Sequence, residues 1–235
     1  MSLTTVKAGS LSIVTSDFYA KPMSFLEGDA RLGYEPELAR LVCQQLALTP
    51  VWHNLAMENF YTSLTTGDYD LVWFNQAITP ERQTKALFTR PYGLFDEAVL
   101  VRQGSPIQSA ADLAGLKVGG LADSTNLELA RSFGNAEIIA FPGSDRVLPE
   151  MLAALRQGEI EALIDDELVL LVAAEEDPSL QLAFSVETRV PFAIAARPSD
   201  SELVNAINQI LEGLIADGSM AALWQTWIPR KTFPF

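Results

Sequence analysis

Histidine and cysteine are almost absent from this chain of 235 residues, which contains one of each. The single cysteine, Cys43, excludes an intramolecular disulfide. With His53 as the only histidine, zinc sites of the usual Cys/His kind are excluded as well. No nucleophile motif lies near His53, so a Ser-His-Asp triad is not indicated. We expect no catalytic residue, no bound metal and no cofactor.

Long apolar runs and basic residues are also scarce. LVLLVAA (168–174) is about the longest apolar run and is far too short to span a bilayer. The opening MSLTTVKAGS lacks the apolar stretch of an export signal, so we expect none in this chain. Thirty Asp and Glu stand against 16 Lys and Arg, for a net charge of −14. This charge repels phosphate backbones and indicates that nucleic acid is not a partner, although it also serves plain solubility.

What the sequence does contain is an alternation of strand-like and amphipathic helical runs, with 49% hydrophobic residues to build a core. This pattern predicts an α/β architecture with largely parallel sheets. The strand-like runs are 11–15, 51–55, 69–74, 97–101, 117–122, 137–141, 161–164, 180–186 and 191–196. The helical runs are 35–47, 58–66, 126–133, 146–157, 167–176, 200–216 and 219–228.

One segment occurs twice, as SLTTGDYDLVWF (63–74) and ALRQGEIEALID (154–165). Each copy has an apolar helix end, a glycine, an acidic residue and then a strand, and Gly67 and Gly158 fit the left-handed position that closes a helix. Helix–Gly–strand is common in α/β proteins. However, each copy is also preceded by its own βαβ-like unit, which predicts two similar lobes with separate sheets.

The first copy continues as LVWFNQAITPERQTK (71–85) and places Arg82 in the first turn of a helix, where the helix dipole disfavours a cation. The second copy continues into IDDE, which contains Asp165 and Asp166. Ligands of open α/β sheets bind beyond the carboxyl ends of the strands. If the lobes face each other across a cleft, a cation from one lobe confronts anions from the other. We therefore predict that the cleft binds the carboxylate and ammonium of an amino acid.

In this interpretation, Arg82 binds the ligand carboxylate. The backbone N–H groups at Asn75 and Ala77 point at the same carboxylate, and a bound anion would turn the helix dipole from unfavourable to favourable.

Four segments together resemble a known family. They are ITPERQTKALFTRPY (78–92), SAADLAGLKVGGLADST (109–125), ALIDDEL (162–168) and the C-terminal stretch 196–228. In this order and spacing they resemble the family 3 solute-binding proteins of amino-acid ABC transporters, which have the type II periplasmic-binding-protein fold. The resemblance covers roughly residues 10–229.

The resemblance implies an α/β fold of two lobes, each a mixed sheet flanked by helices. Lobe 1 would comprise 1–93 plus 190–235 and lobe 2 would comprise 94–189, joined by two hinge strands. It implies a monomer, periplasmic or tethered outside the membrane, that is not an enzyme. Such a protein closes on an amino acid or similar solute and delivers it to a membrane ABC permease.

The resemblance also implies roles for individual residues. Arg82 falls on the position that binds the α-carboxylate, and Asp166 on the position that binds the α-ammonium. Further ligand contacts are expected at the turn before a second-lobe helix, at the end of the first strand and in the side-chain pocket. These are Ser124, Thr125, Ser16, Asp17, Phe18, Tyr19, Met57 and Phe74. Trp73 points the opposite way from Phe74 along its strand and is expected in the core.

Two positions depart from the family pattern. Ala77 stands where a hydroxyl side chain is frequent, which leaves only its backbone N–H. Asp123 stands where glycine is usual, and we expect its side chain to cap the following helix.

Alternatives remain open at several residues. Arg82 could pair on the surface with Glu81 or Glu58, Asp166 could belong to a solvated acidic run, and Ser124 and Thr125 could be ordinary helix caps.

The ligand class and the function also have alternatives. Asp165, Asp166 and Asp17 favour a cationic ligand, whereas Phe74 and Met57 favour an apolar one. The chain could be the sensing module of a membrane receptor. It could also be a periplasmic enzyme like cyclohexadienyl dehydratase, for which Glu167 is the candidate general acid.

Overall fold

The computed structural model describes residues 3–235. Met1 and Ser2, the start of the segment expected to lack an export signal, lie outside the described residues. The chain separates into two compact units. Unit 1 holds the described residues up to Asp17, together with Pro22–Leu94 and Val190–Phe235, and unit 2 holds Phe18–Lys21 and Phe95–Arg189. Phe18–Lys21 thus groups with unit 2, whereas the sequence places it in lobe 1.

The sheet of unit 1 is centred on β1 (Ser10–Thr15), all six residues of which are buried. β1 pairs in parallel with β4 (Thr49–Asn54) on one side and β5 (Leu71–Ala77) on the other. β11 (Leu180–Ala196) runs antiparallel to β5, and β6 (Leu87–Phe88) pairs with β11. The carboxyl end of β5 leads directly into the turn that contains Arg82.

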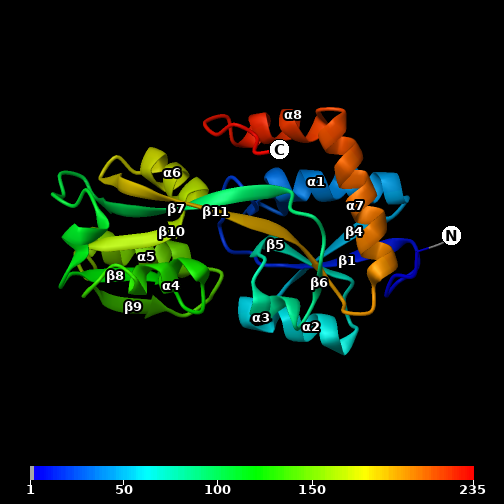
Figure 1. Cartoon of the computed structure of the whole chain (residues 1–235), viewed down its shortest axis with the longest axis horizontal. Coiled ribbons are helices and arrows are strands. Elements are labelled where there is room, and N and C mark those ends of the chain that lie inside the picture. Colours follow the sequence, from blue (N-terminus) through cyan, green and yellow to red (C-terminus); the bar gives the residue numbers. More distant parts are fainter. Residues whose placement is uncertain (1–2) are drawn as a thin grey trace. The chain divides into compact units, whose positions relative to one another are not determined.

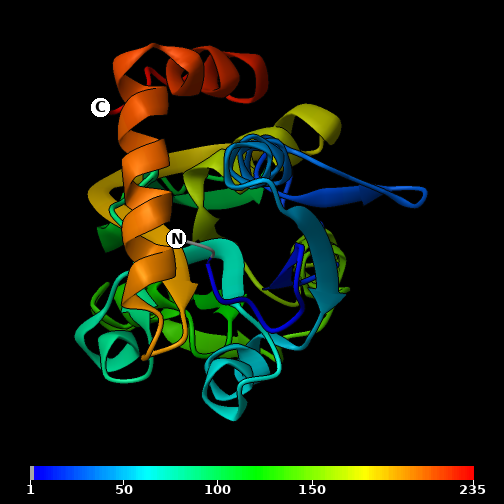
Figure 2. The ribbon, with the colours of Figure 1, turned by 90° about the vertical axis from the view of Figure 1, so that its right-hand side faces the viewer.

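Helices cover both faces of this sheet. α1 (Tyr34–Leu46), α7 (Ser201–Ala216) and α8 (Ser219–Trp227) pack together, and α1 also contacts β4 (Figures 1 and 2). α2 (Phe60–Thr66) lies on the other side of the sheet. The shorter elements are β2 (Phe25–Glu27), β3 (Ala30–Leu32), the 3₁₀ turn Met57–Asn59 and α3 (Pro80–Gln83).

The sheet of unit 2 is built on β10 (Ala162–Asp166), which is buried along its whole length. β10 pairs antiparallel with β7 (Gly93–Arg102) and in parallel with β8 (Lys117–Leu121). β8 in turn pairs in parallel with β9 (Glu137–Phe141). The last residue of β10 is Asp166, which therefore stands at the carboxyl end of a central strand.

Four helical segments complete unit 2. α4 (Thr125–Arg131) and α5 (Val147–Gln157) both contact β8 and β10. α6 (Glu167–Glu176) follows β10 without an intervening loop, and Ala110–Leu113 form a 3₁₀ turn. A core that includes Val99, Val118 and Ile164 fixes the sheet beneath α4.

The predicted glycine positions are confirmed, because Gly67 and Gly158 close α2 and α5 with φ angles of 81° and 77°. Trp73 is 1% exposed and belongs to the core, as predicted. Two expectations need correction. The runs 180–186 and 191–196 form the single strand β11, since the residue before Pro191 favours an extended backbone. The sheets described for the two units are parts of one mixed sheet, rather than separate and largely parallel, because β11 lies between β5 and β7 in the strand order and both β7 and β11 pair antiparallel.

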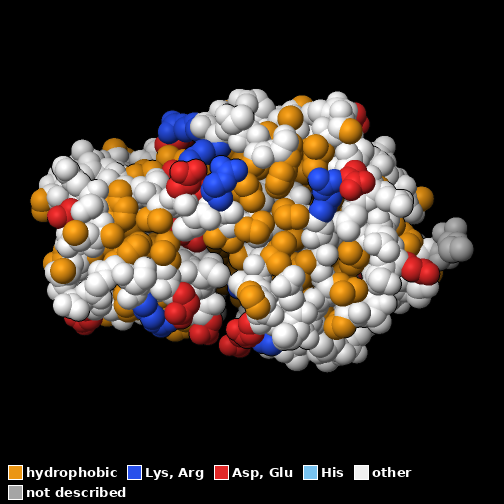
Figure 3. Space-filling model, in the orientation of Figure 1, with side chains coloured by type: hydrophobic (Ala, Val, Ile, Leu, Met, Phe, Trp, Pro, Cys, Tyr) orange, Lys and Arg blue, Asp and Glu red, His pale blue; other side chains and the backbone are white. Residues whose placement is uncertain are grey.

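On the face shown in Figure 3, Lys and Arg side chains lie in small groups beside Asp and Glu, among apolar and uncharged side chains. Within residues 3–235, no helix has both the length and the apolar character that crossing a membrane would require.

Candidate functional site

Arg82 lies in α3, whose first turn is capped by the Thr79 hydroxyl, which accepts a hydrogen bond of 3.2 Å from the Arg82 N–H. The Arg82 side chain is half-buried and turns back toward β5, where its Nη1 atom donates to the Ala77 carbonyl at 3.0 Å. Its guanidinium lies 5.7 Å from the ring centre of Tyr61. Within residues 3–235, Arg82 makes no ion pair, and Glu81 pairs instead with Lys85 at 2.7 Å. The guanidinium is thus oriented by neutral groups, with its charge unmatched by a carboxylate.

The end of β5 is held by a buried carboxylate. Asn75 adopts a left-handed φ of 48°, and its N–H donates to Glu35 Oε1 at 2.6 Å. The Tyr92 hydroxyl donates to the same oxygen. The expectation that the Asn75 N–H points at a ligand is therefore wrong, because Glu35 on α1 occupies this donor. The sequence pattern did not indicate Glu35, because it is separated from Asn75 by 40 positions in the chain.

Ser16 and Asp17 follow β1 and are organised by Arg31, which is 6% exposed. Arg31 donates to the Ser16 carbonyl at 2.8 Å and forms an ion pair with the Asp17 carboxylate. The Asp17 N–H donates to Asn54 at 3.0 Å. Because Arg31 balances the charge of Asp17, the Asp17 carboxylate gives little support for a cationic ligand.

The apolar residues predicted for unit 1 differ in exposure. Phe74 is 5% exposed and packs edge-on against Phe60, with ring centres 6.2 Å apart. Met57, in the 3₁₀ turn before α2, is half-buried. Phe74 therefore belongs mainly to the core, which weakens its support for an apolar ligand.

The turn before α4 corrects one prediction. The cap of α4 is Ser124, whose Oγ accepts from the Leu127 N–H at 3.1 Å, and not Asp123. Asp123 is exposed and adopts a left-handed φ of 59°. Aspartate tolerates this conformation better than most residues, so it can occupy a position where glycine is usual. Thr125 begins the helix, and its hydroxyl donates to the Asn126 side chain at 3.2 Å.

Asn126 joins this turn to the end of β10. It is 6% exposed, and its Nδ2 donates to Asp165 Oδ1 and to Asp166 Oδ1, each at 3.0 Å. Asp166 is 9% exposed and is therefore not part of a solvated run. Burial raises the pKa of Asp165 to about 6. The sequence pattern did not indicate Asn126, although its position directly after the quoted segment 109–125 was an available signal.

Two further carboxyl groups are buried nearby. Glu97 on β7 is 1% exposed and stands opposite Asp166 in the β7–β10 register. Burial and the charges of Asp166, Asp165 and Asp96 raise its pKa to about 9. Glu167 is 6% exposed and accepts a hydrogen bond of 2.7 Å from the Ser185 hydroxyl.

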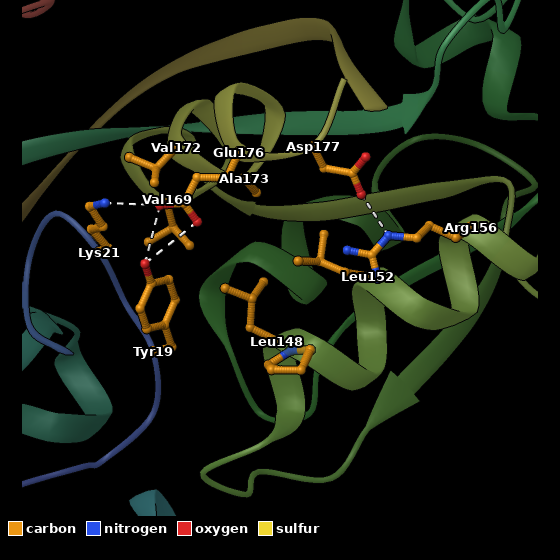
Figure 4. Close-up of a pocket in the computed structure, with 11 residues that line it drawn as sticks. Tyr19, Lys21, Leu148, Leu152, Arg156, Val169, Val172, Ala173, Glu176 and Asp177 are labelled. Carbon is orange, nitrogen blue, oxygen red and sulfur yellow. Dashed lines mark hydrogen bonds and ion pairs between the residues drawn. The ribbon is translucent and has the colours of Figure 1, made fainter. Parts of the chain in front are cut away.

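The two aromatic residues predicted at the end of the first strand group with unit 2. Phe18 is 5% exposed, and the Tyr19 hydroxyl donates to Glu176 at 3.2 Å. Lys21 also donates to Glu176, at 2.9 Å, as Figure 4 shows. Tyr19, Lys21 and Glu176 border a hollow of about 280 Å³ along α5 and α6. Apolar side chains such as Leu148 and Val169 face it (Figure 4).

The comparison with known families decides the identity of the fold. The model of the bacterial extracellular solute-binding proteins, family 3, matches residues 11–230. The chain belongs to this family. The resemblance drawn from the sequence is confirmed, and so is the type II periplasmic-binding-protein fold.

Individual relatives agree with this membership. A probable amino-acid ABC transporter-binding protein of Haemophilus influenzae is 29% identical over 226 residues, covering 94% of this solute-binding protein and 85% of the relative. An ancestral arginine-binding protein, solved with arginine bound, is 25% identical with a TM-score of 0.84, covering 94% and 98% of the two chains. The ancestral amino acid-binding protein AncCDT-1, a precursor of cyclohexadienyl dehydratase, is 27% identical with the same TM-score of 0.84, covering 93% and 95%.

Proposed function

We propose that this solute-binding protein binds an amino acid outside the cytoplasmic membrane and delivers it to a membrane ABC permease. The family membership and the amino-acid-binding relatives support this proposal. In this proposal the two units are the predicted lobes, the protein acts as a monomer in the periplasm or tethered to the membrane, and nucleic acid is not a partner.

The observation that carries the proposal is the state of Arg82. A half-buried guanidinium that contacts a carbonyl and an aromatic ring can still bind a carboxylate in a bidentate, charge-assisted pair. The Tyr61 hydroxyl donates to Gln76 at 2.7 Å, and this hydrogen bond holds the Tyr61 ring next to the Arg82 guanidinium. We assign the ligand α-carboxylate to Arg82, with Ala77 beside it.

The ligand ammonium is assigned to unit 2. Asp166 ends β10, and Asn126 orients its carboxylate through a hydrogen bond to Oδ1. Ser124 and Thr125 border the same turn. The other proposed ligand contacts are Ser16, Asp17, Phe18, Tyr19, Met57 and Phe74.

A thermal-stability screen tests the proposal. The protein is unfolded and refolded to remove any bound solute, and then screened against the amino acids. A ligand at about a thousand times its Kd adds roughly 4 kcal/mol to the unfolding free energy. This should raise the melting midpoint by about 8–16 °C for a chain of this size. No shift with any amino acid would contradict the proposal.

We further propose that the chain binds without catalysing a reaction. Glu167, the candidate acid of the enzymatic alternative, is buried and hydrogen-bonded to Ser185. Because one structural relative is a dehydratase precursor, prephenate and arogenate belong in the same screen, followed by a turnover assay. Measurable turnover of either compound would overturn this part of the proposal.

A further inference from the structure

Glu97 faces the residue to which the ligand ammonium is assigned. The two stand directly opposite each other on the antiparallel strands β7 and β10. Side chains of such pairs lie on the same face of a sheet, with Cβ atoms about 4.5–5.5 Å apart. With exposures of 1% for Glu97 and 9% for Asp166, both carboxyl groups are removed from bulk water at the same point of unit 2.

The two carboxyl groups differ in their hydrogen bonds. Asp166 receives a donor from Asn126, and so does Asp165. Glu97 receives none from residues 3–235, and its buried Oε2 has no partner there. Leaving a buried carboxyl group without a donor costs considerable free energy, so such a group usually has a partner in the functional state of a protein. An N–H group of the ligand would be such a partner.

The neighbouring charges that raise the pKa of Glu97 are all acidic. They are Asp165 and Asp166 on β10 and Asp96 on its own strand. Within the described chain, neither Glu97 nor Asp165 forms an ion pair with Lys or Arg. Burial and these charges raise the pKa of Glu97 to about 9, so the group is protonated at neutral pH in the ligand-free protein.

A single ammonium balances the charge of Asp166, and a second cationic group is needed to favour the ionised form of Glu97 beside it. We propose that Glu97 is a specificity-determining ligand contact: it accepts N–H groups from a second cationic group and selects amino acids with a cationic side chain. This inference rests on the proposed function. It also answers the question left open by the sequence in favour of a cationic ligand, since Asp17 is balanced by Arg31 and Phe74 packs in the core.

Calorimetric titrations with L-arginine, L-lysine and L-glutamine test the inference on the refolded chain. The wild type should bind arginine or lysine at least about tenfold more tightly than glutamine. Glu97→Gln should lose most of this preference, because an amide cannot balance a cation. Repeating the titrations in buffers of different ionisation enthalpy should reveal release of a proton with the cationic ligand and none with glutamine.

The matched control is Glu159→Gln, an exposed glutamate of the same unit. It should keep the affinities and the proton release of the wild type, and far-UV circular dichroism checks that both variants fold. A wild type that prefers glutamine, or a Glu97→Gln variant that keeps the preference for cationic ligands, would overturn the inference while leaving the proposed function intact. Absence of binding by any amino acid would instead overturn the proposed function.

Discussion

Glu35 on α1 accepts the backbone N–H of Asn75 at 2.6 Å and thereby fixes the left-handed residue at the end of β5. The Tyr92 hydroxyl donates to the same oxygen, so one buried carboxyl group satisfies two donors. The turn that orients Arg82 thus depends on a helix that contributes no predicted ligand contact.

Replacing Glu35 should destabilise unit 1. Glu35→Ala leaves two buried donors without an acceptor, and each orphaned donor costs about 1–3 kcal/mol. We expect a fall of about 2–5 kcal/mol in the unfolding free energy, measured by urea denaturation. Glu35→Gln keeps an acceptor oxygen and should lose clearly less. Equal losses for the two variants would show that the hydrogen bonds to Asn75 and Tyr92 are not the cause.

Replacing Arg82 should weaken ligand binding with little effect on stability. Removing one partner of a buried charge pair costs about 2–5 kcal/mol, or roughly 30-fold to a few thousand-fold in affinity. Arg82→Ala should show this loss by calorimetry, and Arg82→Lys should be intermediate because it keeps the charge but not the planar fork. Arg131→Ala, at an arginine whose side chain is 51% exposed, serves as the control. A loss of less than about threefold in Arg82→Ala would sink the role assigned to this residue.

Replacing Asn126 should reduce affinity through Asp166. Hydrogen bonds to charged groups contribute about 1.5–3 kcal/mol, so Asn126→Leu should lower affinity by about 10-fold to 100-fold. Asn126 is a positioning residue in this interpretation. Asn126→Leu removes a donor from two buried carboxyl groups, so its melting midpoint should fall as well, and affinity is therefore measured well below that midpoint. Asn135→Leu changes the same residue type at an exposed position and should leave binding unchanged. Wild-type affinity in Asn126→Leu would contradict the positioning role.

The stability of the ligand-free protein should fall as the pH rises. Burial is the main cause that raises the pKa values of Glu97, Glu35 and Asp165, to about 9, 7 and 6. Between the unfolded and folded pKa values, the folded state binds more protons, so unfolding becomes easier with increasing pH. The stabilisation is fully present below about pH 4 and is lost progressively up to about pH 9.

Melting midpoints measured between pH 5 and pH 9 check this dependence. The decrease of the melting midpoint above about pH 7.5 should largely disappear in Glu97→Gln. Glutamine does not titrate, and Glu97 has the highest of the three folded pKa values. The decrease of the melting midpoint near pH 6 should remain in that variant. A midpoint that rises from pH 5 to pH 9 would have the wrong sign and would exclude buried protonated carboxyl groups as the main titrating species.

Local sequence patterns predicted the elements that carry Arg82 and Asp166. The strand before Arg82 begins with a continuous apolar run, residues 71–74, and Gly67 and Gly158 mark helix ends through a conformation that glycine favours. Such signals lie within a few residues of the structure that they predict. The same locality explains the correct assignment of Trp73 to the core, since alternation along a strand separates it from its neighbours.

The partners of these residues were not predictable in the same way. Glu35 and Asn75 are 40 positions apart, and Asn126 reaches Asp165 and Asp166 across 39 and 40 positions. Nothing in a local pattern states that a helix glutamate will accept a distant backbone N–H. The prediction that Asp123 caps α4 was wrong because aspartate and serine both cap helices. The left-handed backbone angle of Asp123 decides in favour of Ser124 as the cap.

The lone thiol of the chain has a practical consequence. Cys43 is 1% exposed within α1, and burial raises its pKa to about 12, so it presents almost no thiolate to a reagent. A cysteine introduced at an exposed position would therefore react alone with a maleimide dye. The native chain is already a background-free scaffold for a fluorescent biosensor, and no protective substitution in the core is needed to make one.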